Sequence, residues 1–261
     1  MTNPAKPRFD GETLDAFYRG RIRVLQGKKG YRFSVDAPLL ADFVRTREED
    51  EALEIGTGSG IIALLLSVKP FRRITALEIQ AGLADLARRN VDLNGLGWRI
   101  EVVEADFRTY EPGRRFDLVF SNPPYIGKKA GFLSASAEKS AAKHELHGAI
   151  GDFMQKTAEW LAPGGRACFV YPEKRRADLL AAAGESGLGV RRSRSVHPRE
   201  GEPANLFLIE LGHVGKTGGP KAGGQEGMDQ AGGEAELMPP LILFGPDGKF
   251  TADAEAVFAG P

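Results

Sequence analysis

The sequence predicts an α/β protein with a doubly wound, mostly parallel sheet of seven strands and helices on both faces. Three observations support this prediction. From residue 51 onward, apolar β-type runs alternate with stretches of helical periodicity. A glycine-rich turn, Gly56 to Gly60, directly follows the first run. Polar residues stand where four successive runs end, and ligands in such sheets bind beyond the carboxyl ends of the strands.

The elements follow from periodicity and from residues that end helices. Strands are expected at residues 51–55, 73–79, 100–105, 116–121, 166–171, 190–196 and 205–211. Helices are expected at 33–44, 61–68, 80–94, 137–161 and 174–187. Pro70 ends the second helix and Gly95 the third, which carries Leu83, Leu86, Ala87, Asn90 and Val91 on one side.

The N-terminal part combines a loose arm, residues 1–15, with a basic run at 18–32 that contains no acidic residue. Arginines at alternate positions, Arg19, Arg21 and Arg23, predict a strand or hairpin with one basic face. That face either protects a strand edge or contacts phosphates. In the following helix, Ser34 is the expected N-cap. Asp36 lies in the first turn, where the helix dipole favours a carboxylate and where it could also face a ligand.

The chain divides into four predicted segments: a basic arm and helix (1–48), the α/β domain (49–211), a glycine-rich linker (212–236) and a coda (237–261). Glycine density predicts that the linker is flexible. The coda holds an extended apolar stretch at 238–244 and a short helix at 251–258. Its apolar residues suggest that it docks on the rest of the protein.

Composition predicts an ordinary globular protein. The chain has 261 residues, 42% hydrophobic and 27% charged, with zero net charge, so nucleic acid would have to bind to local basic patches. The single cysteine, Cys168, lies in an apolar strand and fits a reducing compartment. We see neither a signal peptide nor an apolar run long enough to span a membrane, and we expect a cytoplasmic protein without a metal site.

The strand ends predict a particular ligand. The turn after Glu54 has the pattern Gly-x-Gly-x-Gly, in which glycines let the backbone approach a ligand closely. Glu54 would attract an ammonium group, Glu78 can bind ribose hydroxyls, and Asp106 can accept from an adenine amino group that Phe107 covers. A ligand with an ammonium group, a ribose and an adenine but no phosphate is S-adenosylmethionine.

The run Ser121-Asn122-Pro123-Pro124-Tyr125 follows the fourth strand of the series. It is either an ordinary strand-ending turn or a site that grips a planar –NH2 group. In the second case the amide oxygen of Asn122 and the carbonyl of Pro123 hold the two hydrogens, and Tyr125 stacks on the attached ring. Two such acceptors would draw the nitrogen toward tetrahedral geometry and free its lone pair.

These two motifs resemble class I S-adenosylmethionine-dependent methyltransferases of the Asn-Pro-Pro-Tyr type, which have a Rossmann-like fold. The flanking stretches 26–36, 142–145, 196–199 and 204–206 resemble the bacterial tRNA1(Val) (adenine-N6)-methyltransferase family. That resemblance implies catalysis by Asn122, Pro123, Pro124 and Tyr125. It implies cofactor binding by Asp36, Glu54, Gly56, Gly58, Gly60, Glu78, Ile79, Asp106, Phe107 and Asn122.

The implied substrate is an adenosine beside the tRNA anticodon, which must be swung out of its stack to react. We expect no obligate protein partner. Two basic clusters could meet the RNA backbone, or could equally be solvated faces: Lys128, Lys129, Lys139 and Lys143, and Arg191, Arg192, Arg194 and Arg199. His144 is expected to be a surface or packing residue, because the chemistry needs no strong base.

Two other functions remain open at this stage. One is N5-methylation of glutamine in a protein such as a release factor, whose planar amide suits the same motif. That family carries a longer helical N-terminal domain than the roughly 50 residues that precede the glycine turn here. The other is a non-catalytic module that binds S-adenosylmethionine or RNA, which would not need an amine-gripping motif.

Overall fold

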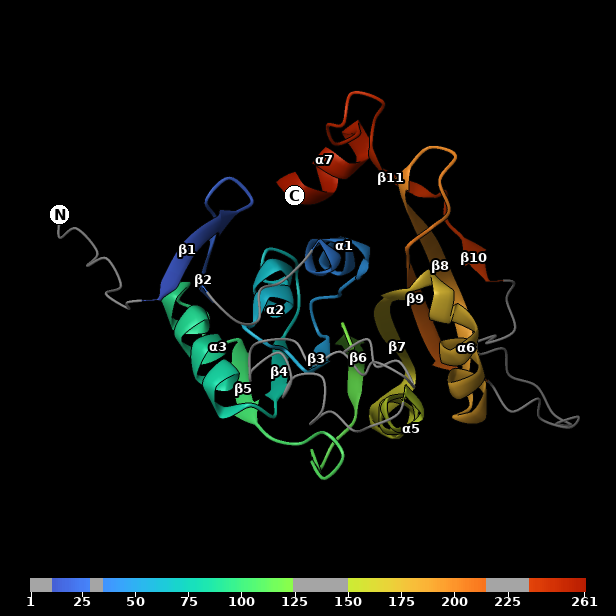
Figure 1. Cartoon of the computed structure of the whole chain (residues 1–261). Coiled ribbons are helices and arrows are strands. Elements are labelled where there is room, and N and C mark those ends of the chain that lie inside the picture. The colour runs from blue at the N-terminus through green and yellow to red at the C-terminus, as the bar shows by residue number, and fades with distance from the viewer. Residues whose placement is uncertain (1–10, 29–34, 124–149, 215–234) are drawn as a thin grey trace, which may run out of the picture.

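A computed structural model describes residues 11–28, 35–123, 150–214 and 235–261 of the chain. Its centre is a nine-stranded sheet in the order β10-β8-β9-β7-β6-β3-β4-β5, with β11 also paired to β8 (Figure 1). The strands are β3 (Glu51–Ile55), β4 (Arg73–Glu78), β5 (Ile100–Glu104), β6 (Phe116–Ser121), β7 (Leu161–Pro172), β8 (Leu188–Arg199), β9 (Leu206–His213), β10 (Glu236–Leu237) and β11 (Leu241–Phe244).

Strand directions confirm the predicted fold class. The five strands from β7 to β5 run parallel, and β9 is antiparallel to both β7 and β8. The predicted width of seven strands is wrong by two, because β10 and β11 extend the sheet along the edge strand β8. β10 straddles the predicted boundary between linker and coda, and β11 lies in the coda. With two and four residues, both strands are too short to give a clear period-2 pattern.

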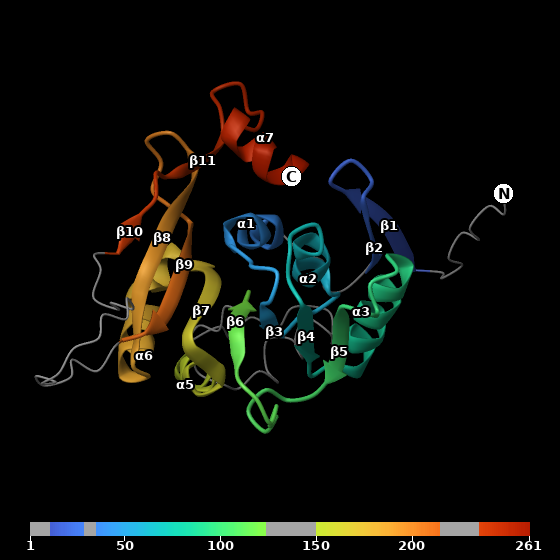
Figure 2. The same cartoon turned by 180° about the vertical axis from the view of Figure 1, so that it is seen from behind.

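Helices cover both faces of the sheet, as Figures 1 and 2 show. One face packs against α1 (Asp36–Phe43), α2 (Ile61–Leu66) and α3 (Ala81–Leu93). The other packs against α5 (Ile150–Trp160) and α6 (Arg176–Glu185), which follows the short 3-10 helix η1 (Glu173–Arg175). Successive residues of a strand point to opposite faces of the sheet, so they pack in different hydrophobic cores. On β6, Leu118 packs in the core beneath α1, α2 and α3, and Val119 in the core beneath α5 and α6.

An antiparallel hairpin precedes this domain. It consists of β1 (Glu12–Phe17) and β2 (Ile22–Gly27), and it packs against α3. The basic run was predicted to form a strand or hairpin, and its residues Ile22–Gly27 do form one strand of this hairpin. The expectation of a loose arm up to residue 15 is wrong from Glu12 onward. The cause is tertiary: β1 has little periodicity of its own and is held by its pairing with β2.

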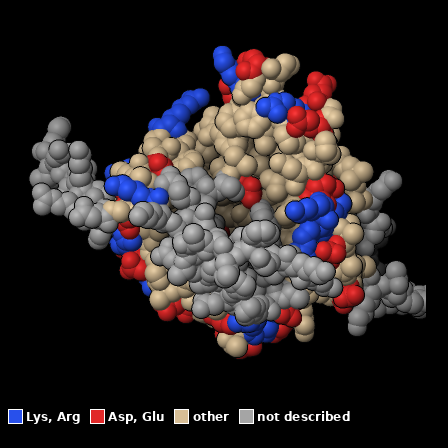
Figure 3. All heavy atoms as spheres, viewed as in Figure 1, with Lys and Arg blue, Asp and Glu red and all other residues tan. Residues whose placement is uncertain are grey.

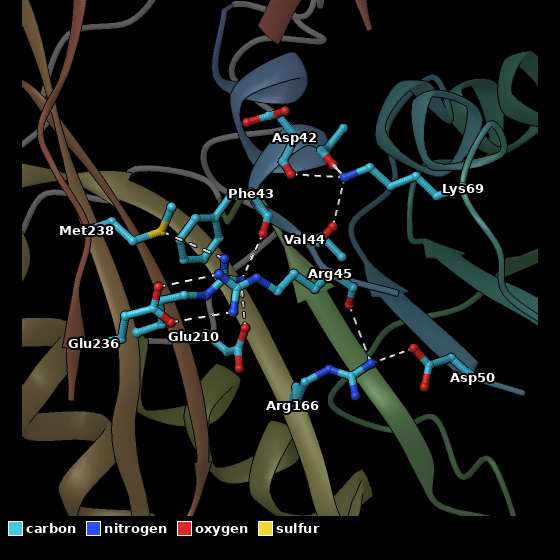
Figure 4. Close-up of polar contacts among 12 residues, drawn as sticks. Asp42, Phe43, Val44, Arg45, Asp50, Lys69, Arg166, Glu210, Glu236 and Met238 are labelled. Carbon is cyan, nitrogen blue, oxygen red and sulfur yellow. Dashed lines mark hydrogen bonds and ion pairs between the residues drawn. The ribbon is translucent and has the colours of Figure 1, made fainter. Parts of the chain in front are cut away.

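Half-buried and buried charged side chains hold the C-terminal end of α1 against the rest of the domain (Figure 4). The Lys69 ammonium donates to the carbonyls of Ala41, Asp42 and Val44 at 2.7, 2.9 and 2.8 Å, which caps the last turn of α1. Burial lowers the pKa of Lys69. Deeper in the sheet, Arg166 on β7 forms an ion pair with Asp50, which precedes β3.

Arg192 belongs to the same buried network. Its guanidinium is 2.7 Å from Glu210, donates to the Phe43 carbonyl at 2.8 Å and stacks on the Phe43 ring. Only 3% of Arg192 is exposed. It therefore cannot meet an RNA backbone, and its assignment to a basic surface cluster is wrong. Charge alone did not reveal that Glu210 lies opposite it on β9.

The coda joins the sheet to the hairpin. After β11, Thr251 caps helix α7 (Ala252–Ala259) by accepting from Ala254 N, and α7 packs on α1. At its end, the Arg21 guanidinium donates to the Pro261 carbonyl at 2.7 Å. Gly260 has a φ of +69°, and a Cβ there would lie 2.2 Å from the ring of the buried Tyr18. The coda is thus packed between the hairpin and α1, as its apolar residues suggested.

This contact predicts a position-specific loss of stability. Gly260→Ala should lower the free energy of unfolding by about 2 kcal/mol, because the new methyl group strikes the Tyr18 ring and the left-handed backbone is strained. Gly248→Ala is the matched control: its φ is +76° but its Cβ would meet nothing within 4 Å. It should cost about 1 kcal/mol. Equal losses in urea unfolding would contradict the close packing of Gly260 on Tyr18.

Candidate active site

Four adjacent parallel strands bring the predicted polar residues to one edge of the sheet. Their spatial order is β6, β3, β4, β5, and the carboxyl end of each carries one such residue, in the same order Asn122, Glu54, Glu78 and Asp106. Neighbouring strands lie roughly 4.8 Å apart, so the four side chains span a distance suited to one extended small molecule. The structure therefore assembles the residues that the sequence predicted to act together.

The glycine turn between β3 and α2 has a backbone that requires glycine. Gly56, Gly58 and Gly60 all have left-handed φ values, of 73°, 58° and 84°. A Cβ on Gly56 would meet nothing within 4 Å, so its side of the turn is open for a ligand. A Cβ on Gly60 would lie 3.4 Å from the Ala87 side chain, which lets α2 pack closely on α3. The turn combines an open approach with tight packing.

Glu54 is completely buried, and its two carboxylate oxygens differ. Oε2 accepts from the Thr57 hydroxyl at 2.6 Å, whereas Oε1 has no hydrogen-bond partner within the described parts of the chain. Burial raises the pKa of Glu54 to about 8, against the opposing effects of hydrogen bonds from the Thr57 hydroxyl and the Ala63 backbone. An unpartnered buried oxygen of this kind suits a cationic donor, because an ammonium group would satisfy it and stabilise the ionised carboxylate.

Glu78, at the end of β4, is held by the backbone. Its Oε2 accepts from Gly58 N at 2.8 Å and its Oε1 from Gln80 N at 2.9 Å. Burial raises the pKa of this carboxyl, and hydrogen bonds from the backbone at Gln80, Gly58 and Ile79 oppose that rise. Each carboxylate oxygen keeps further acceptor capacity, which is what a pair of ribose hydroxyls needs. The bond to Gly58 also fixes the glycine turn against β4.

Asp106 and Phe107 have close protein partners. The guanidinium of Arg108 pairs with both carboxylate oxygens of Asp106, and this pairing lowers the pKa of Asp106. An adenine amino group would therefore share Asp106 with Arg108. Phe107 is buried, with its ring centroid 4.3 Å from that of Phe153 on α5. Asp36 is also buried, as the first residue of α1.

Asn122 directly follows β6 and is half-buried, and Pro123 beside it is buried. The preceding residue anchors both: the Ser121 hydroxyl donates to the Ile55 carbonyl at 2.6 Å and ties the ends of β6 and β3 together. Pro124 and Tyr125 lie outside the described residues, as do Lys128, Lys129, Lys139, Lys143 and His144. The part of the motif that is described thus has a fixed backbone next to the glycine turn.

Sequence reasoning missed three residues that support these side chains. Thr57 orients Glu54, Ser121 ties β6 to β3, and Asn90 on α3 donates to the Ser59 carbonyl of the glycine turn at 2.9 Å. Only Asn90 left a signal, as an amide on the apolar side of a predicted helix. Such a residue, when buried, must find hydrogen-bond partners.

This fold and these strand ends define a class I methyltransferase, an enzyme that uses S-adenosylmethionine as its cofactor. The chain belongs to the methyltransferase small domain family, whose sequence signature matches residues 32–182, and within it to the family of the tRNA1(Val) (adenine(37)-N6)-methyltransferases. A member of that family from Flavobacteriaceae bacterium (strain 3519-10) is 30% identical over 191 residues, which are 72% of this chain and 80% of the relative. One from Cronobacter sakazakii is 28% identical, covering 80% and 84%.

Solved structures support the fold. A predicted O-methyltransferase from Agrobacterium tumefaciens superimposes with a TM-score of 0.60 at 22% identity, covering 85% of this chain and 94% of its own. A Trm5b from Pyrococcus abyssi superimposes with a TM-score of 0.55 at 16% identity, covering 77% and 55%. In the described part of the chain, no helix is both long and apolar enough to cross a membrane.

Proposed function

We propose that the protein transfers a methyl group from S-adenosylmethionine to N6 of an adenosine in tRNA, beside the anticodon. The observation that carries the proposal is the position of Asn122 at the end of β6, one strand from the glycine turn and from Glu54. Relatives named tRNA1(Val) (adenine(37)-N6)-methyltransferase supply the substrate. A tRNA substrate fits the expected cytoplasmic location.

The cofactor would be held by the residues at the strand ends. Glu54 would accept from the ammonium group at Oε1, which has no partner among the described residues. Gly56, Gly58 and Gly60 have no side chains, so the methionine part of the cofactor could approach the backbone of the turn closely. Glu78 would accept from the ribose hydroxyls. Asp106, together with Ile79 and Phe107, would bind the adenine, and Asp36 would close the methionine end. When bound, S-adenosylmethionine supplies an electrophilic methyl group.

Asn122 would act on the other reactant, the exocyclic amine. Its amide oxygen and the Pro123 carbonyl accept from the two N–H bonds, and Tyr125 stacks on the base. These acceptors hold the nitrogen as it becomes tetrahedral, so positioning and electrostatics supply most of the acceleration. The amine then releases a proton to water, because the alkylated nitrogen is far more acidic than the free amine. No strong base is required.

The RNA would meet basic side chains on the hairpin. Arg19, in the tip turn, and Lys28, after β2, are exposed. Arg21 and Arg23 are exposed too, but their guanidinium groups also donate to the carbonyls of Pro261 and Leu93. Elsewhere on the face seen in Figure 3, Lys and Arg are interspersed with Asp and Glu around the rim. The exposed basic side chains at the tip and at the open end of the hairpin are thus the stronger candidates for phosphate contacts.

This surface predicts a change in salt dependence. Replacing Arg19 and Lys28 together by alanine should lower the slope of log affinity for tRNA against log salt by about one to two, because fewer counterions are released. Filter binding at several salt concentrations measures the slope. The control, Arg72→Ala with Arg73→Ala, removes the same charge. These residues lie at the start of β4, whereas the candidate site lies at the carboxyl ends of the strands. An equal change in this control would place the RNA elsewhere.

One experiment separates the substrate classes. The protein is incubated with methyl-labelled S-adenosylmethionine and with separate pools of tRNA, ribosomal RNA and release factors. The proposal expects label in tRNA alone. Label in the release factors would favour the glutamine alternative, whose planar amide suits Asn122 and Pro123 equally well. Binding of the cofactor without transfer to any pool would favour a non-catalytic module.

A further inference from the structure

Two carboxamides, Asn90 on α3 and Asn94 at its C-cap, take the place of a strand beside the hairpin. Asn94 Oδ1 accepts from Arg23 N at 2.9 Å, and its Nδ2 donates to Arg23 O at 2.7 Å. One helical turn earlier, Asn90 Oδ1 accepts from Leu25 N at 2.7 Å, and its Nδ2 donates to Leu25 O at 3.0 Å. Arg23 and Leu25 are alternate residues of β2, so the two amides satisfy its backbone as a neighbouring strand would.

Asn90 makes one contact that Asn94 does not show. Its Nδ2 also donates to the Ser59 carbonyl at 2.9 Å, between two glycines of the cofactor turn. Asn90 has no exposed surface, and both of its Nδ2 hydrogens are used, one toward the hairpin and one toward the turn. The second Nδ2 bond of Asn94 stays inside α3, at the Asn90 carbonyl. A single buried amide thus joins the glycine turn to the hairpin.

We propose that Asn90 is a positioning residue that couples the glycine turn to the hairpin, so that cofactor binding and hairpin order strengthen each other. The turn cannot shift away from Asn90 without leaving the Ser59 carbonyl buried and unpaired, and the same holds for the Leu25 backbone on the other side. Since Gly58 of this turn also donates to Glu78, the bond network continues to the predicted ribose site. Coupling of this kind is reciprocal.

The coupling has a consequence for the substrate, which rests on the proposed function. The hairpin carries Arg19 and Lys28, the exposed basic residues proposed to contact tRNA. A cofactor that orders the turn would then order the hairpin, and tRNA would bind more tightly to the loaded enzyme. The physical link itself needs no nucleic acid and can be tested without it.

The test compares wild type, Asn90→Ala and Asn94→Ala as full-length proteins. Calorimetry gives the Kd for S-adenosylmethionine, and hydrogen exchange follows the amides of residues 22–27 with and without it. We expect the cofactor to slow this exchange in wild type. Asn94→Ala should speed exchange without cofactor but keep the slowing, with a Kd within about twofold of wild type. Asn90→Ala should lose the slowing and raise Kd by about tenfold, the scale of one hydrogen bond.

Any one of three results would overturn the coupling. They are a wild-type exchange rate that the cofactor does not change, a Kd of Asn90→Ala within twofold of wild type, and equal changes of exchange and Kd in Asn90→Ala and Asn94→Ala. If Asn90→Ala does not fold, Asn90→Asp keeps the acceptor for Leu25 N while removing the donors to the Ser59 and Leu25 carbonyls. The wild-type exchange measurement stands without any variant. A failure to methylate tRNA would instead overturn the proposed function and leave these measurements valid.

Discussion

Asn122→Ala is expected to slow methyl transfer by about 10²-fold or more, the scale of one lost preorganised hydrogen bond. Affinity for cofactor and tRNA should stay close to wild type. The amide oxygen would be bonded most strongly when the target nitrogen is tetrahedral, so its loss lowers kcat more than it raises KM. The Ser121 hydroxyl, bonded to Ile55 O, keeps the backbone of the variant in place.

Single-turnover methyl transfer to tRNA measures this effect without product release. Two changes at Tyr125 complete the comparison: Tyr125→Phe should be mild, because stacking survives, and Tyr125→Ala should be severe. A near wild-type rate in Asn122→Ala would show that the motif is only a turn that ends β6.

Glu78→Ala is expected to weaken binding of S-adenosylmethionine by about 10²-fold or more, since two hydrogen bonds to a charged group are lost. The structure adds a second cause, because Gly58 N and Gln80 N lose their common acceptor and the glycine turn loosens. Calorimetry on the folded variant, without nucleic acid, gives the change in Kd.

The matched control for this prediction is Glu104→Ala. Glu104 pairs in register with Glu78 on the neighbouring strand, but its side chain is exposed. Removing it takes away one carboxylate at the same level of the sheet and should leave Kd within about twofold. Equal losses in the two variants would mean that net charge, not contact with the ribose, determines affinity.

The strands and their polar ends could be predicted because their signals are local. The run before Asn122 is apolar and bounded by turns, and the order of elements alone implies that parallel strands deliver their carboxyl ends to one edge. The pairing of side chains could not be predicted. Arg192 meets Glu210 and Phe43, Asp106 meets Arg108, and Asn90 meets Ser59 and Leu25. Except for the Arg108 pair, these contacts join residues far apart in the chain, and local periodicity does not specify them.

The coda shows the same limit. Its stretch at 238–244 was expected to be extended, but nothing in the sequence indicated that β11 would pair with β8 or that Gly260 would pack on Tyr18. Short strands gain their stability from the partner they meet, and that partner is set by the whole fold. The glycine turn was easier to predict, because its left-handed backbone can be formed cheaply only by glycine.

Nucleoside analysis shows whether the protein methylates N6 of adenine in tRNA through the site at Asn122. An unmodified tRNA1(Val) transcript is treated with wild-type protein and S-adenosylmethionine, digested and separated by mass spectrometry. We expect N6-methyladenosine, its loss when adenosine 37 (the position in the relatives' names) is replaced by guanosine, and its near absence with Asn122→Ala. Methylation at another atom of the tRNA, or unchanged yield with the guanosine transcript, would contradict this expectation.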